Sequence, residues 1–182
     1  MIMKMRTLLL ALLHVFFFTA VHAQKEHKPR KPEVAWKTYS DTKERVSMQY
    51  PATWEKKDVK NTVFFFWAPF LQSGQKFREN VNLSVGDAED LYLIEYLMDA
   101  RTKMPQQLEG FKELGSKYVK IGGRDCARMT YQFRHGEMVF QSVLYIFLNN
   151  GKAYTLNFSA LPNSFDKYFP TFDKMANSFR IK

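Results

Sequence analysis

The sequence predicts an α+β domain in which an antiparallel β-sheet is flanked by amphipathic helices. Short runs of alternating apolar and polar residues recur along the chain, most clearly at 80–85. Turn residues separate three consecutive runs between 127 and 158, a pattern typical of a β-meander. Two other segments, near 88–103 and 163–179, repeat apolar residues at helical spacing. Strands and helices are therefore both expected.

The first half of the chain contains three predicted strands. Residues 46–50 alternate between apolar and polar side chains, and Pro51 ends the run. The run 63–67 is apolar on both faces, which predicts either a central strand or an edge strand covered by another element. The third strand, 80–85, has one apolar and one polar face.

The first helix is expected directly after the third strand. Asp87 is the predicted N-cap, and Glu89 and Asp90 in the first turn would complement the helix dipole. A broad apolar stripe continues to about Lys103, and Pro105 should prevent further extension. This helix should lie on a sheet.

The second half of the chain predicts a meander and a closing helix. A short strand at 118–121 turns at two glycines, and strands follow at 127–134, 138–148 and 154–158. Phenylalanines then recur at helical spacing, with a cap region near Asn163. Pro170 lies inside this pattern, so the helix either begins near it or is kinked there. The core of the helix is expected at 171–178.

The N-terminus predicts export. Residues 1–23 have a positive start, an apolar run of 13 residues at 8–20 and small residues before a cleavage point after Ala23. A retained anchor would need about 20 apolar residues. Residues 24–33 then form a basic, proline-containing spacer, and 34–182 form a single domain. The mature protein is expected in a periplasm or outside the cell, without a transmembrane segment.

The net charge limits the classes of partner, and the cysteine content limits how the fold can be stabilised. The net charge of +9 falls to +7 when Lys4 and Arg6 are removed with the signal peptide. Cations are spread along the chain, which indicates a solvated surface, and nucleic acid is not expected as a partner outside the cell. Cys126 is the only cysteine, so no internal disulfide forms and packing must stabilise the fold.

Residues that carry chemistry are few, and no catalytic residue, metal or cofactor is expected. Only His27 and His135 remain after cleavage, which makes a histidine-based triad or zinc site hard to assemble. Cys126, between two arginines in the polar register of its strand, is either a small residue at a strand start or a reactive thiol. The acids at 87–90 are explained by helix capping, although a cation site is the alternative.

The polar faces of the strands are the better candidates for a binding surface. They would gather on one side of the sheet if their strands are neighbours, although solvated sheet faces have the same composition. The polar sets are Asn80, Asn82 and Ser84; Thr155, Asn157 and Ser159; and Arg128, Gln132 and Arg134.

Several segments together form a recognisable pattern. The most specific segment is 77–85, and the others are 50–54, the Gly122–Gly123 turn, the strands 141–148 and 152–160, and Ser178–Phe179. Over about residues 40–180, these segments resemble the PsbP/DcrB-like superfamily. The resemblance implies an α/β/α sandwich with an antiparallel sheet of about six to eight strands. It implies adaptor or chaperone activity with different partners, and no conserved reaction. No organelle-targeting feature supports a photosynthetic role.

Taken together, the residues and the resemblance favour an exported, non-enzymatic binding module that contacts another protein or an envelope component. The expected partner-binding residues are Arg78, Glu79, Asn80, Asn82, Arg128 and Arg134. Arg78 and Glu79 would alternatively be structural and pair across a loop. Two other functions stay open: a carrier of apolar small molecules in a pocket lined by 64–67, and an envelope hydrolase that uses Cys126 or an acidic pair.

Overall fold

The computed structural model describes residues 34–71, 73–88 and 91–182. The expected signal peptide, the basic spacer, Glu89 and Asp90 lie outside these ranges. Val34–Lys182 form one compact unit. No helix within the described ranges is long and apolar enough to cross a membrane.

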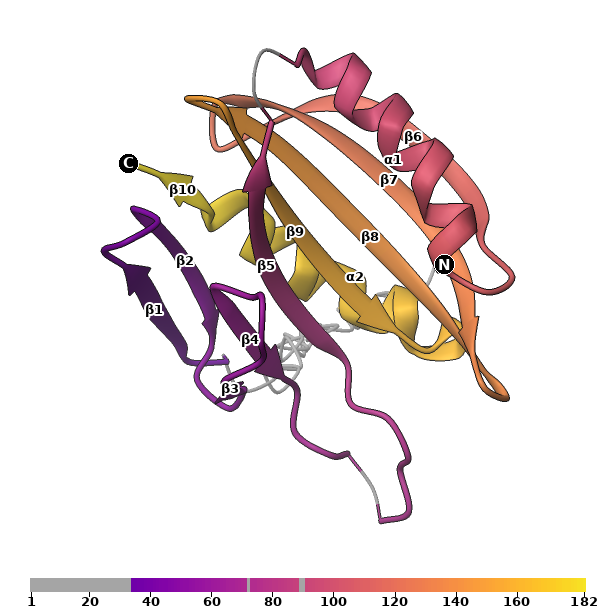
Figure 1. Cartoon of the computed structure of the whole chain (residues 1–182). Coiled ribbons are helices and arrows are strands. Elements are labelled where there is room, and N and C mark those ends of the chain that lie inside the picture. Colours follow the sequence, from indigo (N-terminus) through magenta and orange to yellow (C-terminus); the bar gives the residue numbers. More distant parts are fainter. Residues whose placement is uncertain (1–33, 72, 89–90) are drawn as a thin grey trace, which may run out of the picture. The chain divides into compact units, whose positions relative to one another are not determined.

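The described elements form a mixed set of strands and helices (Figure 1). In chain order they are β1 (Trp36–Asp41), β2 (Val46–Pro51), β3 (Glu55–Lys57), β4 (Phe64–Trp67), β5 (Asn80–Asp87), α1 (Leu93–Gln107), β6 (Lys112–Ile121), β7 (Arg124–His135), β8 (Met138–Asn149), β9 (Lys152–Ala160), α2 (Pro162–Ser178) and β10 (Arg180–Ile181).

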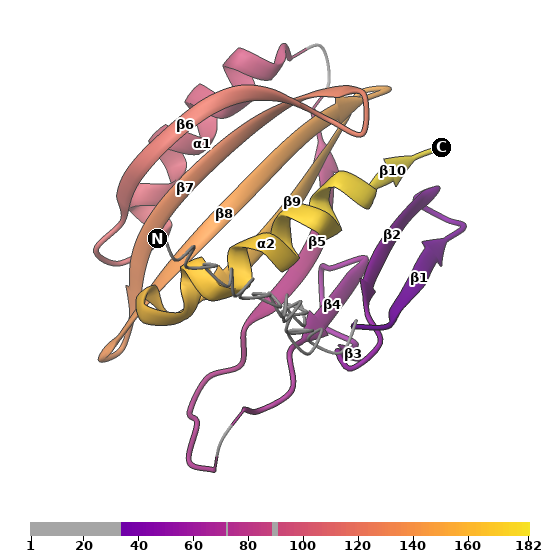
Figure 2. The same cartoon turned by 180° about the vertical axis from the view of Figure 1, so that it is seen from behind.

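The strands of this part of the chain form two antiparallel sheets. The larger sheet has seven strands in the order β3-β4-β5-β9-β8-β7-β6, and the smaller has the order β1-β2-β10. Helix α1 packs on β7 and β8 over one face of the larger sheet, and α2 packs across the opposite face (Figures 1 and 2). The expected antiparallel α/β/α arrangement is confirmed.

Strand β8 shows how the two faces are filled. Val143, Tyr145 and Phe147 belong to the core beneath α2, whereas Leu144 and Ile146 belong to the core beneath α1. Successive side chains point to opposite faces, so a stretch of strand covered on both sides is apolar at consecutive positions. This explains the continuous apolar run 143–148 of β8, which follows the polar Gln141 and Ser142.

Helix α1 begins later than expected, at Leu93 rather than near Asp87. Asp87 is the last residue of β5 and pairs with Lys152, so its backbone belongs to the sheet. Glu95 supplies the cap instead, because its carboxylate accepts a hydrogen bond from the Tyr92 N–H at 2.7 Å. The helix also continues through Pro105, which lies exposed in the last turn.

The apolar stripe of α1 divides between the core and solvent. Leu97 is buried against β7 and β8, whereas Ile94 and Met98 are 54% and 58% exposed. The expectation that this helix lies on a sheet is confirmed. The sheet beneath α1 contacts only one side of the helix, and the rest of the stripe remains at the surface.

Helix α2 is twice as long as the predicted core segment 171–178. It begins at Pro162, follows the N-cap Leu161, and includes Pro170 in its interior. Pro170 lacks the N–H that would donate to the Asp166 carbonyl four positions earlier, and both residues are exposed. Burial of Phe165 and Phe172 on either side of Pro170 holds both halves of the helix on the sheet.

Strand β6 is also longer than the predicted 118–121. It starts at Lys112 and contains a bulge between Glu113 and Gly115. Gly115 has φ of 155° and the local sequence lacks alternation, which explains why the pattern did not reveal the first half of the strand. The Gly122–Gly123 turn that follows is confirmed, with φ of 58° and 83°.

Alanine substitutions at two adjacent residues of α1, Leu97 and Met98, test which face of the helix is buried. Leu97→Ala should lower the free energy of unfolding by about 2–5 kcal/mol, because it opens a cavity in the core. Met98→Ala should change it by less than about 0.5 kcal/mol, because this side chain is at the surface. Urea unfolding of both variants measures the difference, and equal losses would contradict the placement of α1.

Candidate functional site

The face of the large sheet beneath α1 is apolar at one end and polar at the other. In the region of β7 and β8 it carries Ala127, Met129, Leu144 and Ile146, which pack under α1. Towards β9 and β5 the same face carries paired polar residues, which are Asn80 with Ser159, Asn82 with Asn157, and Ser84 with Thr155. Among the described elements, no helix packs on this polar half (Figure 1).

The polar half is internally hydrogen-bonded where it meets the α1 core. The Tyr131 hydroxyl donates to Asn157 Oδ1 at 3.0 Å, and Asn157 Nδ2 donates to Ser159 Oγ at 3.1 Å. The hydroxyls of Ser142 and Ser159 lie 2.7 Å apart. This network satisfies the buried groups and fixes the boundary between the covered and uncovered halves.

An aromatic and charged surface lies at the outer margin of the polar half. Phe65 pairs with Asn82 and Trp67 pairs with Asn80, so both half-buried rings lie on the same face as the asparagines. The rings contact edge to face with centroids 5.6 Å apart. We call this surface the Trp67 cluster, and it consists of Glu55, Lys57, Phe65, Trp67, Phe70 and Arg78.

Two cations, Arg78 and Lys57, lie close to the aromatic rings of the Trp67 cluster. The Arg78 guanidinium lies 5.2 Å from the centre of the Trp67 ring and 5.0 Å from that of Phe70. The Lys57 ammonium lies 5.8 Å from the centre of the Trp67 ring. Glu55 joins both cations, at 2.9 Å from Arg78 Nη1 and 2.6 Å from Lys57 Nζ. These contacts lower the pKa of Glu55, with the hydrogen bond from Lys57 the largest cause.

The β4–β5 connection, residues 68–79, extends beyond the end of the sheet (Figures 1 and 2). Arg78 Nε donates to the Ala68 carbonyl at 2.6 Å and closes the base of the loop. Phe77 packs edge to face on Phe140, with ring centres 4.8 Å apart. The loop is therefore attached to the body at its base.

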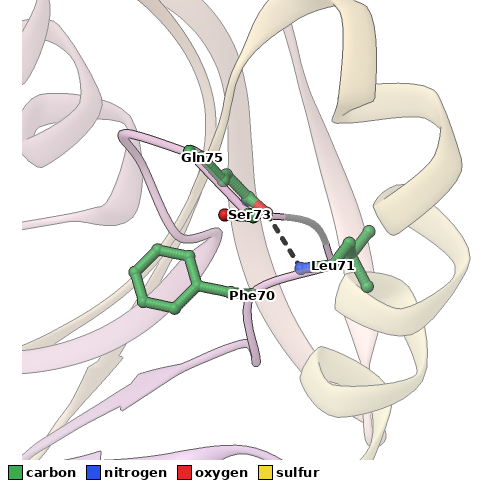
Figure 3. A pocket seen from close by; sticks show the side chains of 5 residues that line it. Phe70, Leu71, Ser73 and Gln75 are labelled. Carbon is green, nitrogen blue, oxygen red and sulfur yellow. Dashed lines mark hydrogen bonds between the residues drawn. The ribbon is translucent and has the colours of Figure 1, made fainter.

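The outer part of the loop is held by Gln75 (Figure 3). Its side-chain carbonyl accepts from the Leu71 N–H at 2.9 Å, and its amide nitrogen donates to the Phe77 carbonyl at 2.6 Å. Phe70 and Leu71 nevertheless remain 58% and 56% exposed, beside an open hollow of about 440 Å³. Their side chains point to different sides of the loop in Figure 3.

Glu79 connects the end of this loop to α2. Its side chain is buried, and Ser164 Oγ in the first turn of α2 donates to Oε1 at 2.6 Å. A carboxylate at this position also complements the positive end of the helix. Burial raises the pKa of Tyr168 to about 12, and the neighbouring Glu79 charge contributes further to this rise.

The structure brings four of the six predicted partner-binding residues together. Arg78, Glu79, Asn80 and Asn82 follow one another through the loop base and β5. Arg78 and Glu79 make intramolecular contacts, as the structural alternative expected, although not with one another. Asn80 is buried and donates to the Arg78 carbonyl at 3.1 Å, and Asn82 is half-buried.

The expectation that Arg128, Gln132 and Arg134 share a face with the asparagines is wrong. Arg128 pairs with Tyr145, which pairs with Leu156, and these residues point to the α2 face. The strand alternation is therefore out of phase with Asn157, which points to the α1 face. Arg134 lies at the exposed end of β7, where it pairs with Glu109 at 2.8 Å.

Of the Trp67 cluster, only Arg78 was among the predicted partner-binding residues. The run 63–67 is uniformly apolar, so its sequence does not distinguish the two inward rings, Phe64 and Phe66, from the outward ones. Pairing of this run with the alternating strand 80–85 determines which of its rings point to each face of the sheet. Lys57 and Phe70 lie outside the apolar run, and only the fold brings them to Trp67.

Cys126 lies in the same register as Arg128, as its sequence neighbours suggested, but the core beneath α2 encloses it. It is fully buried in the α2 core, and this burial raises the pKa of its thiol to about 12. At neutral pH the thiol is therefore protonated and enclosed, which disfavours the reactive-thiol alternative. Its burial agrees with the alternative of a small packed residue.

Of the run 64–67 proposed to line an apolar pocket, Phe64 and Phe66 are packed against protein side chains, whereas Phe65 and Trp67 point to the opposite face. Tyr39 contacts both Phe64 and Phe66, with ring centres 5.2 and 5.7 Å apart, and Tyr50 stacks on Phe66 at 4.2 Å.

Residues 34–71, 73–88 and 91–182 contain no group of three or more acidic, histidine or cysteine side chains placed to hold a metal.

The order of the sheet and the two helices define a PsbP-like α+β fold. The PsbP family model matches residues 35–181, and the chain therefore belongs to the PsbP family. A comparison with curated proteins gives no match.

Solved structures from three organisms share this fold. Cyanobacterial PsbP (CyanoP) from Synechocystis sp. PCC 6803 is 20% identical, with a TM-score of 0.62 over 82% of this chain and 94% of that chain. LpqN of Mycobacterium tuberculosis, described as involved in cell envelope biogenesis, is 11% identical with a TM-score of 0.61, over 82% and 92%. The Ran-binding protein Mog1p of Saccharomyces cerevisiae is 6% identical with a TM-score of 0.60, over 82% and 96%.

The link between Glu79 and Ser164 gives a stability prediction. Glu79→Ala should lower the free energy of unfolding by about 1–3 kcal/mol, because it removes a buried hydrogen-bonded carboxylate. The loss should be smaller when Ser164 is already alanine, since the two side chains act as a pair. Urea unfolding of the single and double variants measures this coupling. Glu137→Ala, at an exposed position, is the control, and strictly additive losses would contradict the link.

Proposed function

We propose that this protein is an exported, non-enzymatic binding module that contacts another protein through the Trp67 cluster and the adjoining loop tip. The observation that carries the proposal is the combination of exposure and restraint in residues 68–79. Phe70 and Leu71 present apolar side chains to solvent, while Gln75 and Arg78 hold the loop that carries them. A loop that served only as a connection would not need exposed apolar side chains at its tip.

The composition of the Trp67 cluster suits a protein partner. Tryptophan and arginine are over-represented among the residues that dominate binding energy at protein interfaces. Trp67 and Arg78 are already stacked, so less conformational entropy is lost when a partner covers them. The half-buried Asn82 and Asn157 beside them supply hydrogen-bonding groups for the rim of the same interface.

Family membership supports a binding role without identifying the partner. The yeast structure with this fold is described as a Ran-binding protein, and the mycobacterial one as involved in cell envelope biogenesis. Those descriptions belong to those proteins, and the identities of 6% and 11% carry only the fold. We infer a binding role here because this chain has the same scaffold and a preorganised aromatic surface.

The N-terminal sequence supports export. Residues 1–23 have the charge, length and small final residues of a signal peptide, and residues 24–33 have the composition of a spacer. Cleavage after Ala23 would place the 34–182 domain in a periplasm or outside the cell. The partner is accordingly a protein or another component of the envelope, and not nucleic acid.

Site-specific photo-crosslinking tests the proposed surface. A photoreactive phenylalanine at position 70 of the exported protein should give a discrete protein adduct in intact host cells. The same group at position 59 should not, although Val59 is also an exposed apolar residue in a loop. Mass spectrometry of the adduct identifies the partner for binding measurements with purified proteins.

Affinity measurements with the partner identified by crosslinking then show how much Trp67 contributes to the free energy of binding. Trp67→Ala should raise Kd roughly thirty-fold or more, because loss of a central interface residue costs about 2 kcal/mol or more. Val59→Ser should leave Kd unchanged. If the Trp67→Ala variant folds and binds as tightly as the parent protein, the proposed surface is wrong.

A further inference from the structure

A second exposed surface follows the free edge of the large sheet and lies away from the Trp67 cluster. Strand β6 has ten residues and pairs with β7 on one side, while its other side carries no strand of the described ranges. The opposite edge of the same sheet is β3, which has three residues. A long edge strand offers a row of backbone donors and acceptors to which another extended segment can add.

The two sides of this edge have different chemistry. On the α2 side, Lys112 pairs with Gln132 and Lys117 pairs with Arg128, so three cations lie on one face. An open hollow of about 460 Å³ lies there, at the β6 bulge, and its lining includes Lys117, Arg128 and Gln141. This side is suited to acidic side chains.

The α1 side of the edge carries exposed apolar side chains beside an Arg101–Glu113 ion pair. Tyr118 of β6 is 53% exposed and pairs with Ala127, which faces α1. Arg101 of α1 reaches β6, where its Nη2 lies 2.8 Å from Glu113 Oε1. Ile94 and Met98 precede Arg101 by seven and three residues, so they share its side of the helix and border the same edge.

We propose that β6 accepts an extended segment of a partner protein that alternates acidic and apolar residues and adds to the sheet as an additional strand. Alternate side chains of such a segment point to opposite faces. Its acidic residues would meet Lys112, Lys117 and Arg128, and its apolar residues would meet Tyr118, Ile94 and Met98. The order of charges along the edge therefore selects the partner.

Charge also disfavours two other candidate occupants of the β6 edge, which are a second copy of this chain and its own segment 24–33. In a pair of β6 strands from two copies of this chain, the lysines of one edge would face those of the other, which is unfavourable. The segment 24–33 of this chain is itself basic, with Lys25, Lys28, Arg30 and Lys31. An acidic segment from a different protein is the occupant that the cations favour.

Peptide binding to the mature chain tests this proposal. The probe is an alternating Val–Glu peptide of about ten residues, the length of an ordinary strand. The first comparison peptide alternates Val and Lys, and the second has the acidic composition with prolines that prevent strand pairing. At about 0.15 M salt, the Val–Glu peptide should bind at least roughly ten-fold more tightly than either. Slowed hydrogen exchange of β6 amides should accompany binding.

Charge-reversal variants locate the site. Lys112→Glu with Lys117→Glu should weaken binding of the Val–Glu peptide at least roughly ten-fold. Lys60→Glu with Lys167→Glu changes the net charge equally at exposed positions elsewhere, and should change Kd less than about two-fold. Trp67→Ala should leave this peptide affinity unchanged.

Three results would overturn the proposal. Equal binding of the proline-containing peptide would indicate electrostatic attraction without strand addition. An unchanged affinity after charge reversal at Lys112 and Lys117 would place the peptide elsewhere. Concentration-dependent dimerisation that protects β6 amides, measured by sedimentation and hydrogen exchange, would make a second copy the occupant.

Discussion

The alternation of side chains across four central strands is the constraint on which the rest of the structure depends. Strands β5, β9, β8 and β7 are paired in one antiparallel register, so each residue is committed to one face of the sheet. One face is apolar across β5, β9 and the central part of β8, and receives α2. The other is apolar beneath α1 and polar beside it. A shift of one residue in β5 would bury its asparagines beneath α2 and expose Val81 and Leu83.

The surface proposed for binding, beside the uncovered half of the sheet, is restrained because its neighbouring loop is held at both ends. Arg78 closes the loop base through the Ala68 carbonyl and also stacks on Trp67. Glu79, the next residue, points to the other side and accepts a hydrogen bond from Ser164 of α2. Two adjacent charged residues thus attach one loop to both faces of the sheet. Exposure of Phe70 on this restrained loop is what distinguishes the surface from an ordinary solvated sheet face.

The fold could be predicted from the sequence wherever local pattern decides the structure, as in the meander and its turns. The start of α1 could not, because Asp87 is a good N-cap whose backbone is taken by pairing with β9. Pro170 did not end α2, since aromatic burial on both sides outweighs one missing helical hydrogen bond. The site could not be predicted where it depends on which face of the sheet each side chain occupies. Arg128 lies on the opposite face from the asparagines, and Trp67 becomes part of a surface only through pairing with β5.

The most direct test of the central claim is fluorine NMR of the protein labelled with 5-fluorotryptophan. The chain has three tryptophans: Trp36, Trp54, which is buried against α2, and Trp67, which lies in the Trp67 cluster. When the partner identified by crosslinking is added, the account predicts that the Trp67 resonance shifts and the Trp54 resonance stays in place. Saturated binding with an unchanged Trp67 resonance would contradict it.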